Sequence, residues 1–350
     1  MVIHYKCPRC GADMAWDSVH GMLSCESCGH QMRAEDYQTT SHEPEASFGE
    51  YASKLQNDLQ EYHCQNCGAV LLTDRETAAT TCSFCGAGVV LADRLSGTDA
   101  PVFVLPFSIS KEEAMAAFKK WCKNGMLTPK GFMTANRVKN ITGIYVPFWL
   151  YDVGGIAEAD ATATRVRTYT RGDYIYTETS YYHVYRRMRI QYEKIPADAS
   201  EKMNDAMMDK LEPYHYQDLI PFSLPYLAGF LAERNSYSAE EVFDRARRRA
   251  AAYMDQQLRD SISGYSSVTY NTKRTDPACQ KAHYTLLPVW MVCYDYKQSE
   301  HIFAMNGQTG KIVGTPPLSK GKIAAWFAGI SGGLFAAMQL VTLLMGGVFL

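Results

Sequence analysis

The chain has 350 residues, of which 47% are hydrophobic and 21% are charged, and its formal net charge is -2. This length exceeds one small domain and allows two or three units with a hydrophobic core. The near-neutral charge excludes a global field that would attract DNA or lipid. Eight of the 11 cysteines lie in the first quarter of the chain, where the pattern is most informative.

Four motifs of the form CxxCG recur at CPRCG, CESCG, CQNCG and CSFCG. In each successive pair, 14 residues separate the two motifs, and the second pair repeats the first 57 positions later, which indicates an internal duplication. Two CxxC turns supply the four thiolates that Zn²⁺ binds in a tetrahedron, and the following glycine permits the φ that such a turn needs. We therefore predict two zinc ribbons, over residues 1–37 and 61–95, with one structural ion each. The predicted ligands are Cys7, Cys10, Cys25 and Cys28 in the first ribbon and Cys64, Cys67, Cys82 and Cys85 in the second.

Reduced thiols are expected, because the start MVIHYKCPRC is not an apolar export segment. Similar ligands hold iron–sulfur clusters, so the sequence leaves zinc and iron open. Three histidines lie nearby, but four cysteines saturate each site, and we expect His20, His30 and His63 at the surface. Four thiolates close the coordination shell, which predicts a structural and not a catalytic metal.

The charge of the ribbons separates two classes of partner. Residues 1–95 carry 6 Lys and Arg against 13 Asp and Glu, a net of -7. Each Zn²⁺ bound by four thiolates adds about -2. Non-specific affinity for nucleic acid comes from cationic side chains, so this surface disfavours phosphates and favours protein partners. Between the ribbons, residues 38–60 begin as a polar linker, and we expect a short helix near residue 50.

Residues 101–318 predict an α+β domain with an antiparallel sheet. Two capping boxes, Ser110 with Glu113 and Ser238 with Glu241, open the helices expected over KEEAMAAFKKWC and SAEEVFDRARRRAAAYMDQQLRDSI. In the second helix, the predicted inward stripe consists of Val242, Phe243, Ala246, Ala250, Tyr253 and Leu258.

The strands of this domain have two further patterns. Residues 161–196 alternate polar and strand-forming residues and reverse at Gly172 and Asp173, which predicts a long antiparallel hairpin. Its interleaved Tyr and Arg resemble single-strand stacking platforms in composition, but a half-exposed sheet explains them as well, and we favour the sheet. YVPFWLYDV and LLPVWMVCYDY echo one another and predict two related β modules within 101–318, with helices on one side.

No catalytic motif stands out. A P-loop, HExxH and a Rossmann glycine fingerprint after a strand are all missing from the sequence. Asp152, Asp295 and His301 could serve as acid–base groups, but carboxylates at strand ends are common structural features. We therefore expect a protein without enzymatic activity.

The last 28 residues, 323–350, contain no Asp, Glu, Lys, Arg or His. About 20 helical residues cross the hydrocarbon core, so this segment predicts one transmembrane helix in contact with membrane lipid. Lys320 and Lys322 precede it, and positive charge near a span stays on the cytoplasmic side. We thus expect a single-pass protein of the cell membrane, with the ribbons and the middle domain in the cytoplasm.

Small residues repeat every four positions in this segment, at Ala325, Gly329, Gly333 and Ala337. Such a stripe allows close helix approach and would permit a homo-oligomer. These patterns are frequent by chance, so the sequence leaves the oligomeric state open.

Several segments together resemble a bacterial family of TFIIB-type zinc-ribbon membrane proteins: the Cys-rich ribbons, LPFSISKEEAMAAFKKW, GIYVPFWLYD, LEPYHYQDLIPFSLPYLAGFLAE, FAMNGQTGKIVG and the terminal span. The resemblance covers nearly the whole chain. It implies genes placed beside a phage-shock protein A homologue and an SPFH-type protein, and hence a role in membrane stress or membrane organisation. It supplies no catalytic residues, and the eight cysteines match its ribbon pattern.

The sequence is compatible with three functions. The sequence favours a membrane-anchored adaptor, facing the cytoplasm, whose ribbons recruit protein partners such as phage-shock protein A-like or SPFH-type proteins. The alternative is a nucleic-acid-binding regulator tethered to the membrane, which the acidic ribbons disfavour. The third is an enzyme working through the middle domain, which would need a deep polar pocket near Asp152 or Asp295.

Overall fold

The computed structural model describes residues 2–37, 59–64, 67–82, 87–95, 100–123, 127–129, 132, 141–296 and 299–344. Within these residues the chain contains three β-sheets and four α-helices, which confirms the mixed α and β class. The largest sheet has 11 strands and joins most of the molecule, and the smaller sheets have three and two strands. The helix expected near residue 50 lies outside the described residues.

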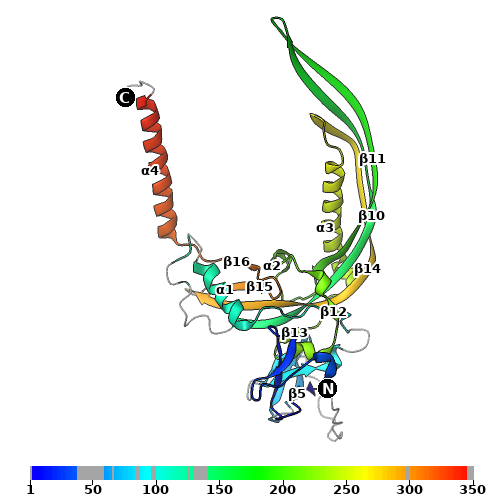
Figure 1. Ribbon diagram of the computed structural model, residues 1–350, viewed down its shortest axis with the longest axis vertical. Coiled ribbons are helices and arrows are strands. Elements are labelled where there is room, and N and C mark those ends of the chain that lie inside the picture. Colours follow the sequence, from blue (N-terminus) through cyan, green and yellow to red (C-terminus); the bar gives the residue numbers. More distant parts are fainter. Residues whose placement is uncertain are drawn as a thin grey trace.

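Three long strands form the spine of the fold. β10 (Ile141–Arg171) pairs antiparallel with β11 (Tyr174–Asp198) on one side and with β14 (Ser267–Tyr296) on the other. The chain reverses between β10 and β11 at Gly172, whose φ of 62° suits a residue without a side chain. The predicted hairpin is therefore present and longer than expected. Its outer part, residues 152–192 with 267–281, curves away from the body and is called the arm (Figure 1).

Helix α3 (Ala239–Asp260) packs on the concave face of the arm (Figure 1). Its capping box is formed, because the Ser238 hydroxyl accepts the Glu241 N–H while the Glu241 carboxylate accepts the Ser238 N–H. The buried positions fall every four residues, at Val242, Ala246, Ala250, Met254 and Leu258. The expected stripe was wrong at Tyr253, which is 46% exposed, while its neighbour Met254 is fully buried.

The arm accepts the helix because β10 presents small side chains to it. Ala157, Ala159 and Ala163 are completely buried and belong to one cluster with Met254 and Leu258 of α3. Alternate residues of a strand share a face, so this run of alanines makes a shallow surface on which a helix can lie closely.

The two echoing segments lie in neighbouring strands of one sheet. Tyr145 is opposite Pro288, and Pro147 is opposite Leu286. Beneath them, aromatic rings from distant parts of the chain meet: Phe107 stacks on Phe230 with ring centroids 4.1 Å apart and tilts against Trp290 at 4.9 Å. These contacts hold the body of the molecule together at the base of the arm.

Shorter elements complete the body. Helix α1 (Lys111–Lys123) begins at the predicted capping box, where the Glu113 N–H donates to the Ser110 hydroxyl. The others are β9 (Phe103–Val104), α2 (Asp205–Lys210), β12 (Ile220–Pro221), β13 (Leu231–Glu233), β15 (Ser299–Asn306), β16 (Ile312–Gly314) and the short 3-10 helices Ala34–Asp36, Ala92–Leu95, Tyr216–Asp218 and Leu224–Leu227.

Helix α4 (Lys320–Leu344) stands apart from the rest (Figure 1). Over Lys320–Thr342 its mean hydropathy is 1.5, and none of this stretch is buried against the protein. Its base is held where the Ser319 N–H donates to the Leu127 carbonyl at 2.8 Å and the Lys322 ammonium donates to the Thr128 carbonyl at 2.7 Å. The described residues thus contain one helix long and apolar enough to cross a membrane, and residues 345–350 of the predicted span lie outside them.

Candidate metal centres

The first cysteine block folds into short strands joined by two tight turns. Its strands are β1 (Val2–Ile3), β2 (Met14–Asp17), β3 (Met22–Cys25) and β4 (Gln31–Met32). In each CxxC turn the glycine N–H donates to the carbonyl of the first cysteine, at 2.9 Å for both Gly11 and Gly29. Both glycines have positive φ, 76° and 69°, as the sequence predicted.

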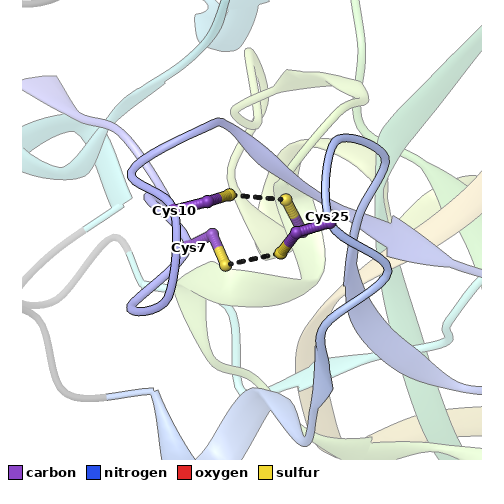
Figure 2. Close-up of side chains that lie close together, drawn as sticks. Cys7, Cys10 and Cys25 are labelled. Carbon is purple, nitrogen blue, oxygen red and sulfur yellow. Dashed lines mark hydrogen bonds between the residues drawn. The ribbon is translucent and has the colours of Figure 1, made fainter.

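These two turns bring four sulfur atoms together. Figure 2 shows the side chains of Cys7, Cys10 and Cys25 directed toward one another from the two turns. The Sγ atoms of Cys7 and Cys28 are 3.6 Å apart, those of Cys10 and Cys25 are 3.5 Å apart, and all four lie within 4.8 Å of one another. A tetrahedral ion about 2.3 Å from each sulfur would separate the sulfurs by about 3.8 Å. The four thiols therefore fit a metal ion.

The backbone of the first turn favours the thiolate of Cys7. Burial raises the pKa of this thiol, but hydrogen bonds from the backbone N–H groups of Arg9 and Cys10, together with those from the thiols of Cys28 and Cys10, more than offset burial and lower the pKa to about 7. A metal ligand must lose its proton, so these donors prepare the residue for binding.

The second block brings three of its cysteines together. The Sγ atoms of Cys64, Cys67 and Cys82 lie within 4.8 Å of one another, and those of Cys67 and Cys82 are 3.7 Å apart. The turn at Gly68 repeats the first block, with φ of 73° and an N–H donated to the Cys64 carbonyl at 2.8 Å. Cys85, the fourth predicted ligand, lies outside the described residues. Both clusters could bind metal.

The strand register reveals the duplication. The second block contains β5 (Leu59–His63), β6 (Val70–Asp74), β7 (Thr77–Thr81) and β8 (Gly88–Leu91). Leu23 pairs with Met32 and Ser24 with Gln31 in the first block; Thr80 pairs with Val89 and Thr81 with Gly88 in the second. Every partner is displaced by 57 positions, so the repeat extends from the sequence to the pairing of the backbone.

Both blocks are built into the body of the molecule. β1 of the first block pairs with β8 of the second, and β7 pairs with β13 of the middle region, so strands from both blocks belong to the 11-stranded sheet. Trp16 packs edge-on against Tyr226, with ring centroids 4.8 Å apart. A metal bound at either cluster would stabilise this sheet as well as its own turns.

Sequence reasoning missed one residue that holds the second block together. Arg94 is buried, its guanidinium lies 5.0 Å from the ring centroid of Tyr62, and it donates to the carbonyls of Asp74 and Thr77. It thereby ties the end of the block to both of its strand pairs. An arginine in a turn-rich segment carries no sequence signal for this role.

The other candidate residues whose side chains are described do not join the clusters. His20 and His63 are exposed, the His20 ring bonds Asp17 at 2.6 Å, and His30 belongs to neither cluster. The Asp152 carboxylate accepts the Lys194 N–H at 3.1 Å and lies 3.9 Å from His283. The side chain of Asp295 lies outside the described part, and His301 packs edge-on against Phe132.

Comparison with known proteins gave one informative match. The chain is 53% identical to the uncharacterized protein YdjG of Bacillus subtilis over 350 residues, which is the full length of both chains. No family model matches the sequence. No solved structure matches it either.

Proposed function

The chain belongs to the protein family of Bacillus subtilis YdjG, and from this premise we propose that it is a membrane-anchored adaptor that recruits protein partners through its paired cysteine blocks. The anchor is α4, the two cysteine blocks are zinc ribbons, and both blocks face the cytoplasm with the middle domain. The partners are phage-shock protein A-like or SPFH-type proteins, as the resemblance to the zinc-ribbon membrane family implies.

The observation that carries this proposal is the contrast between α4 and the rest of the chain. α4 is apolar on all sides and buries nothing against the body, so it needs an apolar environment elsewhere. The cysteine clusters suit a structural ion, because four thiolates complete the coordination of the metal and leave no coordination position for substrate. A helix of this kind joined to closed metal sites suits an anchored binding protein better than a catalyst.

Electrostatics favours protein over nucleic acid at the ribbons. Residues 1–95 carry 13 acidic against 6 basic side chains, and exposed carboxylates such as Glu26 lie beside the cysteine turns. A phosphate backbone would meet repulsion there, whereas a basic protein surface would be attracted.

Crosslinking in native membranes tests the adaptor. The full chain is captured in detergent after crosslinking, and the recovered proteins are examined for phage-shock protein A-like and SPFH-type members. We expect the Cys25→Ser and Glu26→Lys variants to lose them, whereas Cys279→Ser and Glu178→Lys, which change exposed residues outside both ribbons, retain them. Partners that persist in both ribbon variants would contradict the proposal.

The nucleic-acid alternative makes a different prediction in the same preparation. A membrane-tethered regulator would bind DNA or RNA with an affinity that falls steeply as salt is raised. Salt-sensitive binding that survives Glu178→Lys and is abolished by neutralising Arg165 and Arg167 of the arm would favour this alternative over the adaptor.

A further inference from the structure

A cationic pocket is lined by residues of α2 and β16 and of the segments beside them. In the ribbon, β16 lies on the side of the body from which α4 departs (Figure 1). The volume of the pocket is about 540 Å³, within the range of roughly 300 to 1,000 Å³ that ligand sites occupy. The polar residues that line it are Asn204, Lys210, Lys311 and Thr315. This pocket has no part in the metal centres.

The two lysines give the pocket a positive charge, and no carboxylate lines it. Asp205 and Asp209 of α2 are four residues apart, share the other face of the helix and pair with Arg245 of α3 at 2.9 and 3.2 Å. Among the described residues, neither Lys210 nor Lys311 forms an ion pair, and the Lys311 ammonium donates to the Glu212 backbone carbonyl. The arrangement separates the negative charges of α2 from the pocket.

Uncharged groups in the pocket add hydrogen-bonding capacity. Asn204 uses its Oδ1 atom to accept the Met207 N–H at 3.0 Å, which leaves its Nδ2 group as a donor. Thr315 contributes a hydroxyl. Two ammonium groups with amide and hydroxyl donors are a set that suits a phosphate.

A larger cavity adjoins the pocket, shares Asn204 and Ala206 with it and provides a contrast. It has a volume of about 700 Å³ and is lined by Glu201, Asp205 and Glu241 with Arg245 as its one cation. Three carboxylates against one arginine disfavour an anion. The preference for anions therefore belongs to the α2–β16 pocket and is not a general property of this end of the molecule.

The pocket lies close along the chain to the apolar helix. Thr315 lines the pocket and α4 begins at Lys320, five residues later, a span of at most about 18 Å for an extended chain. With α4 in a bilayer, Lys320 and Lys322 lie at the level of the headgroups, and the pocket lies within reach of the same layer.

We propose that the α2–β16 pocket binds the phosphate of an anionic phospholipid headgroup through Lys210 and Lys311. This inference rests on the proposed membrane anchorage by α4. It adds a lipid preference to the adaptor: the protein would select anionic regions of the membrane and present its ribbons there.

The test measures lipid retention by the full chain purified in detergent, with phosphatidylglycerol and phosphatidylcholine offered in equal amounts and read by native mass spectrometry. We expect the wild type to retain phosphatidylglycerol preferentially. The double variant Lys210→Gln/Lys311→Gln should reduce this preference about tenfold or more, given the attraction of each lysine for anionic lipid. The control Lys111→Gln/Lys281→Gln, which neutralises two exposed lysines outside the pocket, should leave it unchanged.

Other outcomes would overturn the inference. A wild type without lipid preference, or an equal loss in the control, would mean that the pocket is not a headgroup site. Inorganic phosphate that binds without lipid and displaces phosphatidylglycerol completely would identify a soluble ligand instead. A full chain that a carbonate wash releases from membranes would refute the anchorage as well, whereas an anchored chain indifferent to lipid charge refutes the headgroup site alone.

Discussion

In the three CxxC turns whose two cysteines are both described, these cysteines differ in their exposure to solvent. The first cysteine of every turn, at Cys7, Cys25, Cys64 and Cys82, is at most 3% exposed, while Cys10, Cys28 and Cys67 are exposed. The buried cysteines belong to hydrophobic clusters, so each of these three turns directs one ligand inward and one toward solvent. An ion held between them links the surface of each block to its small core, which metal binding therefore stabilises.

Replacement of a buried ligand should empty one site and leave the other. For Cys64→Ser we expect bound metal to fall from two ions to one per chain, with thermal unfolding of residues 59–95 at a lower temperature, because the binding energy of a structural zinc is about 10 to 16 kcal/mol. Elemental analysis of the purified protein measures the stoichiometry. Cys279→Ser removes an exposed thiol outside both clusters and should change nothing. Two ions retained in Cys64→Ser would contradict the assignment.

Asp198 is a buried carboxyl at the end of β11. It is 1% exposed, its Oδ1 atom accepts the Ser200 N–H at 3.1 Å, and burial raises its pKa from the ordinary value of 3.8 to about 8. The folded chain therefore keeps a proton that the unfolded chain releases. Between these two pKa values the stability falls as the pH rises, because the unfolded state binds fewer protons.

The substitution Asp198→Asn should remove this dependence. We expect the variant and the wild type to have similar stability at about pH 2.5, below both pKa values, where the carboxyl is protonated in both states. The variant should be more stable by a few kcal/mol at pH 9, where the wild type buries a charge. Denaturant unfolding across this range measures the difference. Asp160→Asn is a control in which the pH dependence should have the opposite direction. Hydrogen bonds from Asn271 and His183 lower the pKa of Asp160, so this carboxylate contributes stability that is lost as the pH falls. A difference at Asp198 that does not grow with pH would contradict the argument.

At the scale of elements, α3 and α4 show how apolar surface is distributed. α3 has a buried stripe along one side and charged residues on the other, the pattern of a helix that packs on a sheet. α4 exposes large side chains around its circumference, including Trp326, Phe327, Leu334 and Phe335. A folded body that leaves such a helix uncovered has its core complete without it.

Removal of α4 should therefore leave the body folded and change its solubility. We expect residues 1–319 to be recovered without detergent and to unfold at the same temperature as the full chain, because no part of the apolar stretch is buried against the body. Fractionation and circular dichroism measure both properties. The full chain should require detergent. A truncated chain that aggregates, or a full chain that stays in aqueous solution, would contradict an anchoring role for α4.

At the scale of the whole molecule, α4 and the arm extend from the body in the same direction (Figure 1). The 25 residues of α4 extend for about 38 Å. The 20 residues of β10 from Asp152 to Arg171 extend for about 66 Å. A bilayer crossed by α4 in this orientation would also contain the arm and the exposed Arg247 and Arg248 of α3.

Two arrangements are possible in a membrane: the arm enters the bilayer together with α4, or α4 changes its orientation and the arm stays outside. Their free-energy costs differ. Each arginine in the centre of a bilayer costs at least about 2.5 kcal/mol. Turning α4 away breaks the two hydrogen bonds that join its base to the described residues Leu127 and Thr128, each worth about 1 kcal/mol. The second cost is smaller, so we expect α4 to tilt about residues 315–319 when it enters a membrane and the arm to stay in water.

Hydrogen exchange on the full chain measures this rearrangement. Amides of the arm and α3 should exchange at the same rate in detergent and in lipid nanodiscs, whereas those of α4 should be protected in nanodiscs. The rate for the Ser319 amide, which donates to the Leu127 carbonyl, should rise on transfer to nanodiscs if the base opens. Protection of residues 165–182 by the bilayer would show that the arm enters it instead.

Much of the local structure could be predicted from the sequence. The CxxCG spacing predicted the turns and their positive φ at Gly11, Gly29 and Gly68, because glycine is the residue that adopts this conformation at little cost. The capping boxes at Ser110 and Ser238 predicted where α1 and α3 begin. The uncharged tail predicted a helix that the body does not cover. These features depend on neighbours close in the chain or on composition.

Only the tertiary structure decided how distant segments combine. It placed β7 and β8 of the second cysteine block in the same sheet as the middle region, paired the two echoing segments with each other, and buried Met254 in place of Tyr253. It also brought Lys210 and Lys311, about 100 positions apart, into one pocket while turning the carboxylates of α2 toward α3. The sequence by itself determined the turns, the caps and the apolar tail. The turns and caps follow from local backbone geometry, and the uncovered tail follows from the favourable transfer of apolar side chains out of water. Pairing between strands required the fold, because any strand can hydrogen-bond with many others, and packing of the whole core selects among them.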